Sequence, residues 1–142
     1  MEAQVVTAAH SAPDVLAAAD VSSCDRAALD ELVATMRPLR SALASFEVSI
    51  SRRARELAED SADVLAEHGR NGRREAKAAA ERERACSDVP AFESALAEGA
   101  VSPGHVDALA LATHGLDEST LASFAEYGPA LAERAASMSV TA

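Results

Sequence analysis

A heptad-like spacing of large apolar residues constrains this chain more than any other feature of its sequence. The series consists of Leu29, Leu32, Met36, Leu39, Leu43, Phe46, Ile50 and, after one missed position, Leu57. The missed position holds Arg53. Alternating steps of three and four place side chains on one face of an α-helix, so the series predicts one long helix of about 43 Å. Pro38 predicts a kink or a break in it, because proline removes a backbone hydrogen bond and clashes with the carbonyl of Ala34.

The composition favours an all-α fold. Hydrophobic residues make up 49% of the 142 residues, but 35 residues are alanine, aromatic residues make up 3%, and there is no tryptophan. Alanine is the best helix former and lets helices approach closely, whereas sheets need β-branched and aromatic side chains. We therefore expect the long helix to pack with a set of short helices.

Turn and capping residues divide the rest of the chain. The expected short helices cover residues 62–67, 72–86, 91–97, 103–113, 118–126 and 130–138. Residues 1–22 are expected to form a loosely ordered arm with at most a short helix after Pro13. Residues 23–142 are expected to form a single helical domain.

Charge is distributed unevenly along the chain. The net charge is −10 overall, with −5 in residues 1–36, +2 in residues 37–84 and −7 in residues 85–142. The whole chain repels nucleic acid and anionic membranes at long range. A contact with DNA is therefore expected only in the middle third.

A basic stripe lies in that middle third. It consists of Arg70, Arg73, Arg74, Lys77 and Arg84. These side chains fall within about 100° on a helical wheel, with Glu81 among them, while Ala76, Ala79 and Ala80 lie on the opposite side. Asn71 is an expected N-cap. A basic face backed by a small-residue packing face is typical of a helix that enters the major groove, so these cations and Asn71 are the candidate DNA-binding residues.

A second interpretation of the same segment is a solvated surface of mixed charge. Glu75, Glu81 and Glu83 stand three or four residues from neighbouring bases and would form ion pairs along the helix.

Residues 63–112 resemble the domain-of-unknown-function 222 family, also called the 13E12 repeat family. The resemblance rests on Val89-Pro90 and on the run ALAEGAVSPGHV at residues 95–106, preceded by an alanine- and arginine-rich helix and the long heptad helix. Members of this family commonly precede an HNH endonuclease domain. The resemblance covers about residues 25–140 and implies a DNA-associated module that is truncated relative to the family.

Residues 60–112 are also similar to the helix-turn-helix of ParB-type partition proteins. In that comparison residues 65–68 end the first helix and residues 72–84 form the recognition helix. Both resemblances imply duplex DNA as the partner. The alternative function is a helical protein-interaction or oligomerisation domain without any contact to nucleic acid.

No catalytic, cofactor or metal-binding pattern emerges from the sequence. Nucleotide-binding loops, serine-hydrolase elbows and paired-cysteine zinc spacings are missing, and an HNH site would need more than the single Asn71. His105 and His114 are nine residues apart and point to opposite faces of a helix, so hydrogen bonding or packing is expected of His105. The chain is expected not to be an enzyme.

The two cysteines, Cys24 and Cys86, are expected to be free thiols in a cytoplasmic protein without a membrane segment. The positions that flank the heptad series offer few complementary charges for a dimer of two such helices. On one side they are Val33, Arg40, Glu47 and Ala54, and on the other Thr35, Ala42, Ser49 and Glu56. Packing within the chain, with Phe46 buried, is therefore the expected role of the long helix, and homo-oligomerisation stays open.

Overall fold

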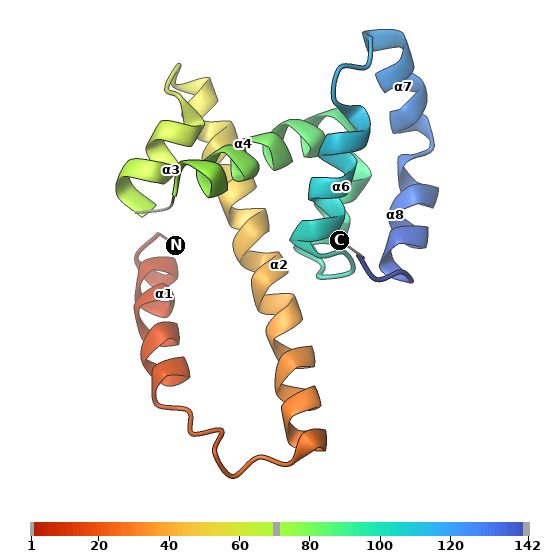
Figure 1. Ribbon diagram of the computed structural model, residues 1–142. Helices are drawn as coiled ribbons and strands as arrows, with labels where there is room; N and C mark the ends of the chain where they lie inside the picture. The colour runs from red at the N-terminus through yellow and green to blue at the C-terminus, as the bar shows by residue number, and fades with distance from the viewer. Residues whose placement is uncertain (1, 70–71, 141–142) are drawn as a thin grey trace. The chain divides into compact units, whose positions relative to one another are not determined.

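The computed structural model describes residues 2–69 and 72–140, and its regular structure over these residues is entirely helical. The all-α prediction is confirmed. The helices are α1 (Glu2–Ala17), α2 (Arg26–Glu56), α3 (Ser61–Gly69), α4 (Arg73–Asp88), α5 (Pro90–Ala97), α6 (Pro103–Thr113), α7 (Glu118–Glu126) and α8 (Gly128–Ala136) (Figure 1). The chain divides into two compact units, one ending at Ala34 and the other beginning at Thr35.

In the first unit, α1 is longer than the sequence predicted. It begins at Glu2 and includes Pro13, so the expectation of at most a short helix after Pro13 is wrong. The alanine-containing stretch before the proline carries enough helix propensity to form the earlier turns. At the start of α2, the backbone N of Ala28 donates to Asp25 Oδ1 at 2.9 Å, which caps the helix.

The long helix α2 continues through Pro38, so the predicted break is absent. Gly99, in the turn after α5, lies beside this residue in the same unit, since a Cβ at Gly99 would lie 3.5 Å from Pro38 Cβ. The buried face of α2 is made of small residues, namely Ser41, Ala44, Val48, Ser51 and Ala54. Small side chains let the helix lie close to the neighbours that it packs against.

The main core lies between α2, α4, α5 and α6. Its fully buried side chains include Val48, Val89, Leu96, Val101 and Val106. Side-chain hydrogen bonds also fix the middle of α2 to the segment before α6 and cap the start of α7. Ser41 Oγ donates to the carbonyl of Val101 at 2.9 Å, and Asp117 Oδ1 accepts from the backbone N of Thr120 at 2.9 Å. Among the described helices, none is both long enough and apolar enough to span a bilayer.

Candidate functional site

The described part of the predicted basic stripe is exposed on α4. Arg73, Arg74, Lys77 and Arg84 are all solvent-accessible, and at about 100° per residue they cover one side of the helix. We call these four residues the basic face. Arg70 and Asn71 lie outside the described residues. The residue that caps α4 is Gly72, which makes no side-chain hydrogen bond to the helix.

The opposite side of α4 packs as the sequence predicted at Ala76 and Ala79, whereas Ala80 is only half-buried. Ala76 is 1% exposed and Ala79 is 3% exposed, and both join a small apolar cluster with Leu65 of α3. Ile50 of α2 packs against the edge of this cluster. The basic face is therefore held outward by an alanine face that leaves α4 little room to rotate.

Acidic side chains lie beside the first turns of the basic face. Lys77 Nζ is 3.9 Å from Glu81 Oε1, one turn along α4. Asp60 and Asp63 line a shallow hollow together with Arg73 and Lys77. The electrostatic potential at this end of α4 is consequently mixed rather than uniformly positive.

On the other flank of the basic face the acid contributed by α6 is already engaged, although Glu81 of α4 lines this flank too. Lys77, Arg84 and Asp107 border a hollow that also contains the exposed Leu111. Asp107 accepts from Arg82 Nε at 2.6 Å and from Arg82 Nη2 at 3.1 Å, which joins α6 to α4. Across the described residues, the ion pairs of the acidic segment 85–142 do not include the basic face.

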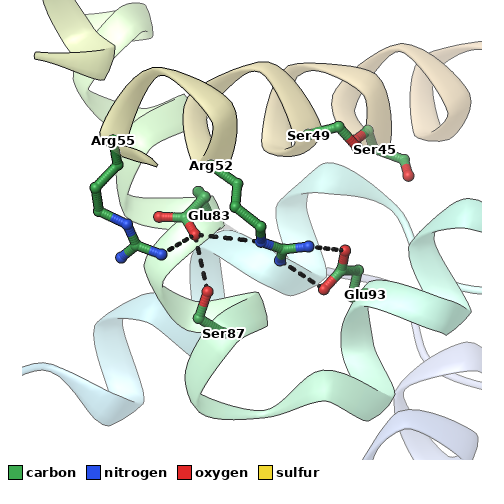
Figure 2. A network of polar contacts seen from close by, with 7 residues as sticks. All are labelled: Ser45, Ser49, Arg52, Arg55, Glu83, Ser87 and Glu93. Atoms are coloured by element: carbon green, nitrogen blue, oxygen red, sulfur yellow. Dashed lines mark hydrogen bonds and ion pairs between the residues drawn. The ribbon is translucent and has the colours of Figure 1, made fainter. Parts of the chain in front are cut away.

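A buried carboxylate fixes the C-terminal half of α4 to α2. Glu83 is 4% exposed. Its Oε1 atom lies 2.7 Å from Arg55 Nη2, 3.7 Å from Arg52 Nε and 2.8 Å from the Oγ of Ser87, which donates to it (Figure 2). A carboxylate with this little exposure is stable in a protein only when cations and hydrogen-bond donors surround it.

Arg52 extends the same network to α5. Its Nη1 and Nη2 atoms donate to Oε1 and Oε2 of Glu93, each at 2.7 Å (Figure 2). The hydrogen bond to Glu93 raises the pKa of Arg52 above its ordinary value. Bidentate pairs of this kind fix orientation as well as distance, so Arg52 sets α2, α4 and α5 in register.

Sequence reasoning missed this network and assigned Glu83 to the surface. That second interpretation is wrong for Glu83, because its ion pairs are with Arg52 and Arg55 of α2 and not with a base on its own helix. The signal was present in the spacing: Ala76, Ala79, Glu83 and Cys86 follow steps of three and four on the buried face of α4. An acid on a buried face predicts a cation on the facing helix.

The large apolar side chains of α2 are exposed. In the unit that begins at Thr35, Met36 is 37% exposed, Leu39 57%, Leu43 61% and Phe46 51%. We call these four residues the apolar stripe. The prediction that Phe46 is buried is therefore wrong, since the helix packs internally through its small residues instead. The helices that pack on α2 are rich in alanine and lie close to it. The face of α2 with small side chains permits this close packing.

His105 has the hydrogen-bonding role that the sequence predicted. The backbone N of Ser102 donates to Nδ1 at 3.0 Å, and Nε2 lies 3.1 Å from the carbonyl oxygen of Met138. The ring therefore closes the start of α6 and holds the segment after α8. In the described part of the chain, no group of three or more histidine, cysteine, aspartate or glutamate residues is arranged to hold a metal ion.

The comparisons with known proteins identify no relative of this chain. Comparisons of the chain with protein-family models, with curated proteins and with solved structures find no match.

Proposed function

We propose that this chain is a DNA-associated helical module of the kind that accompanies HNH-endonuclease-like proteins, and that the basic face of α4 contacts duplex DNA. The proposal assigns no catalytic step to the chain. The observation that carries it is the exposure of the basic face: Arg73, Arg74 and Arg84 are exposed. The two acids of segment 85–142 that form ion pairs among the described residues, Glu93 and Asp107, pair with Arg52 and Arg82. The resemblance to the domain-of-unknown-function 222 family supports the same proposal.

The packing of α4 favours contact through its first turns. Its C-terminal half is fixed by Glu83 and Arg82, whereas Arg73 and Arg74 stand exposed at its start. Recognition helices in helix-turn-helix proteins contact base edges through their N-terminal residues, where the helix dipole also attracts phosphate. Arginine there can pair with phosphates or with guanine.

The acids around the basic face limit the expected affinity. Asp60, Asp63 and Glu81 lie close to the cations, and the chain carries a net charge of −10. We expect binding in the range of non-specific complexes, roughly 10⁻⁴–10⁻⁶ M at physiological salt. Neutralisation of four phosphates would give a log–log salt slope of about −3.6.

The test is a titration of a fluorescently labelled duplex at low salt, read by anisotropy. The variant Arg73→Glu/Arg74→Glu should lose binding and keep its helical circular dichroism, because both side chains are exposed. The matched control, Arg37→Glu/Arg134→Glu, changes the net charge equally on exposed positions of the same unit outside α4 and should bind almost as well. Glu81→Gln should bind more tightly, since it removes the acid beside Lys77.

Two results would contradict the proposal. One is no binding by the unaltered chain up to about 50 µM, which lies inside the expected range. The other is an equal loss in the Arg73/Arg74 variant and in the control, which would indicate an effect of overall charge alone.

A second candidate function is a helical protein-interaction domain, and the apolar stripe favours it. Its side chains are 37–61% exposed at heptad spacing, and contiguous apolar surface of this kind is typical of interaction sites. An apolar fluorescent dye should bind the unaltered chain and not the variant Leu43→Glu. Equal dye binding by both would contradict this function.

A further inference from the structure

The apolar stripe has the spacing of one half of a coiled coil. Met36, Leu39, Leu43 and Phe46 follow steps of three, four and three along α2. The face of α2 that packs on α4 and α5 carries Ser41, Ala44, Val48, Ser51 and Ala54, and it lies on a different side of the helix. The stripe therefore stays available while the core of the unit is complete.

We propose that the apolar stripe pairs with the same stripe of a second copy of this chain, with the two α2 helices antiparallel and Leu43 opposite Phe46 of the second copy. This inference rests on the second candidate function and names its partner. In this alignment Leu39 lies opposite Ile50 of the second copy, which is half-buried against the α3–α4 cluster and would complete this layer with its exposed part.

The charges beside the stripe select this alignment. Arg40 and Glu47 flank the stripe on the same side, seven residues apart. In the proposed alignment Arg40 lies opposite Glu47 of the second copy, and the two-fold axis repeats the pair. A shift of one heptad in either direction would place Arg40 opposite Arg40, or Glu47 opposite Glu47, and like charges would repel.

A parallel dimer has no such support. With the helices parallel and in register, Arg40 would face Thr35 and Glu47 would face Ala42. The scarcity of complementary pairs noted in the sequence thus holds for the parallel arrangement, whereas the antiparallel one forms the Arg40–Glu47 pair twice.

Arg40 is open for such a pair, and Glu47 keeps part of its surface exposed. Arg40 is exposed, and it takes part in none of the ion pairs found among the described residues. Glu47 is half-buried, and this burial raises the pKa of its carboxyl while the charge of Arg82 opposes the rise. A second cation from the other copy would stabilise the charged form of Glu47 further.

The experiment is sedimentation velocity on the full chain over a range of concentrations. The unaltered chain should show a concentration-dependent dimer. Leu43→Glu places a charge in the centre of the stripe and should yield a monomer. The matched control Leu111→Glu makes the same change at a position of α6 that is 80% exposed and should sediment like the unaltered chain.

Charge exchange tests the orientation. Arg40→Glu alone and Glu47→Arg alone each place like charges opposite each other, and each should weaken the dimer about tenfold. Mixing these two variants should restore dimers, because every facing pair in the mixed dimer is then complementary. If circular dichroism shows that Glu47→Arg does not fold, sedimentation of Arg40→Glu and Leu43→Glu still tests the proposed dimer, since both positions are exposed.

Three results would overturn the inference: a monomer at all concentrations, unchanged dimers in Leu43→Glu, or mixed variants that stay monomeric. For a chain that stays monomeric, binding of the apolar dye then distinguishes failure of self-association from failure of the second candidate function. A monomeric chain that binds the apolar dye, and loses it in Leu43→Glu, overturns self-association and supports the second candidate function. A monomeric chain that binds no dye contradicts both, and points to cover by another segment of the same chain.

Discussion

Arg55 on α2 lies 2.7 Å from Glu83 on α4, measured between Nη2 and Oε1, although Glu83 is 4% exposed and Arg55 remains largely open to water. The carboxylate of Glu83 thus lies inside the unit, while the guanidinium of Arg55 reaches it from the solvent-exposed surface. Arg52 and Ser87 complete its surroundings. This arrangement keeps the C-terminal half of α4 fixed and leaves its first turns to carry the basic face.

Loss of the charge on Glu83 should destabilise the fold. Glu83→Gln keeps the shape of the side chain but leaves Arg55 and Ser87 with a weaker acceptor, so the free energy of unfolding should fall by about 2 kcal/mol. Urea denaturation followed by circular dichroism measures the change. Glu98→Gln, at an exposed position, is the control and should be nearly neutral. Equal stability of both variants would mean that the buried pair contributes nothing.

Phe46→Ala should have little effect on the monomer. Phe46 is 51% exposed, whereas Leu96 is 0% exposed in the main core. Leu96→Ala should therefore lower the free energy of unfolding by about 3 kcal/mol, and Phe46→Ala by less than about 1 kcal/mol. Both are measured by denaturation at low protein concentration. A large loss in Phe46→Ala would show that the apolar stripe is covered in solution.

The two buried serines on α2 should respond in opposite directions. Ser41 Oγ donates to the carbonyl of Val101 at 2.9 Å, while Ser51 Oγ is buried without a hydrogen-bond partner among the described residues. Ser41→Ala should thus destabilise the fold by about 1 kcal/mol, and Ser51→Ala should be neutral or stabilising. Thermal unfolding of the two variants side by side checks this. The reverse order would contradict the hydrogen-bond assignment.

The two thiols should differ in reactivity. Burial raises the pKa of the Cys86 thiol to about 12, and Cys86 is 0% exposed, whereas Cys24 is half-buried. The thiolate is the reactive form, so at pH 8 an aromatic disulfide reagent should label Cys24 promptly and Cys86 only on unfolding.

Under denaturing, non-reducing conditions both thiols should be labelled, as expected for the free cysteines that the structure contains. Labelling of Cys86 in the native state at the rate of Cys24 would show that the core opens readily. Absence of label after denaturation would instead indicate a disulfide.

Local signals in the sequence were sufficient to place most helices. Pro90 begins α5 and Pro103 begins α6, within one residue of the predicted ranges, and Asp117 caps α7. Gly99 and Gly115 follow α5 and α6 with φ of 74° and 77°, a conformation that glycine adopts without strain. These features depend on residues within a few positions of each other, so they could be predicted without knowing the fold.

The basic face was equally predictable because it is a property of one helix. The alanine side of α4 had to be buried for the arginine side to be exposed, and Ala76 and Ala79 are buried. The DNA-binding role itself stays a prediction. Glu83 was misassigned because its cations, Arg52 and Arg55, are about thirty residues away and meet it only after α2 and α4 have packed.

The sequence by itself determined that the chain is helical, where most helices begin and end, and which residues share a face. The tertiary structure alone decided which face of α2 enters the core. The heptad series that includes Leu43 and Phe46 is the more apolar face, yet the small face around Ala44 and Val48 is buried. Periodicity identifies faces, but burial depends on the shape of the facing surface, and the alanine-rich helices of this chain accept a helix that can lie close to them.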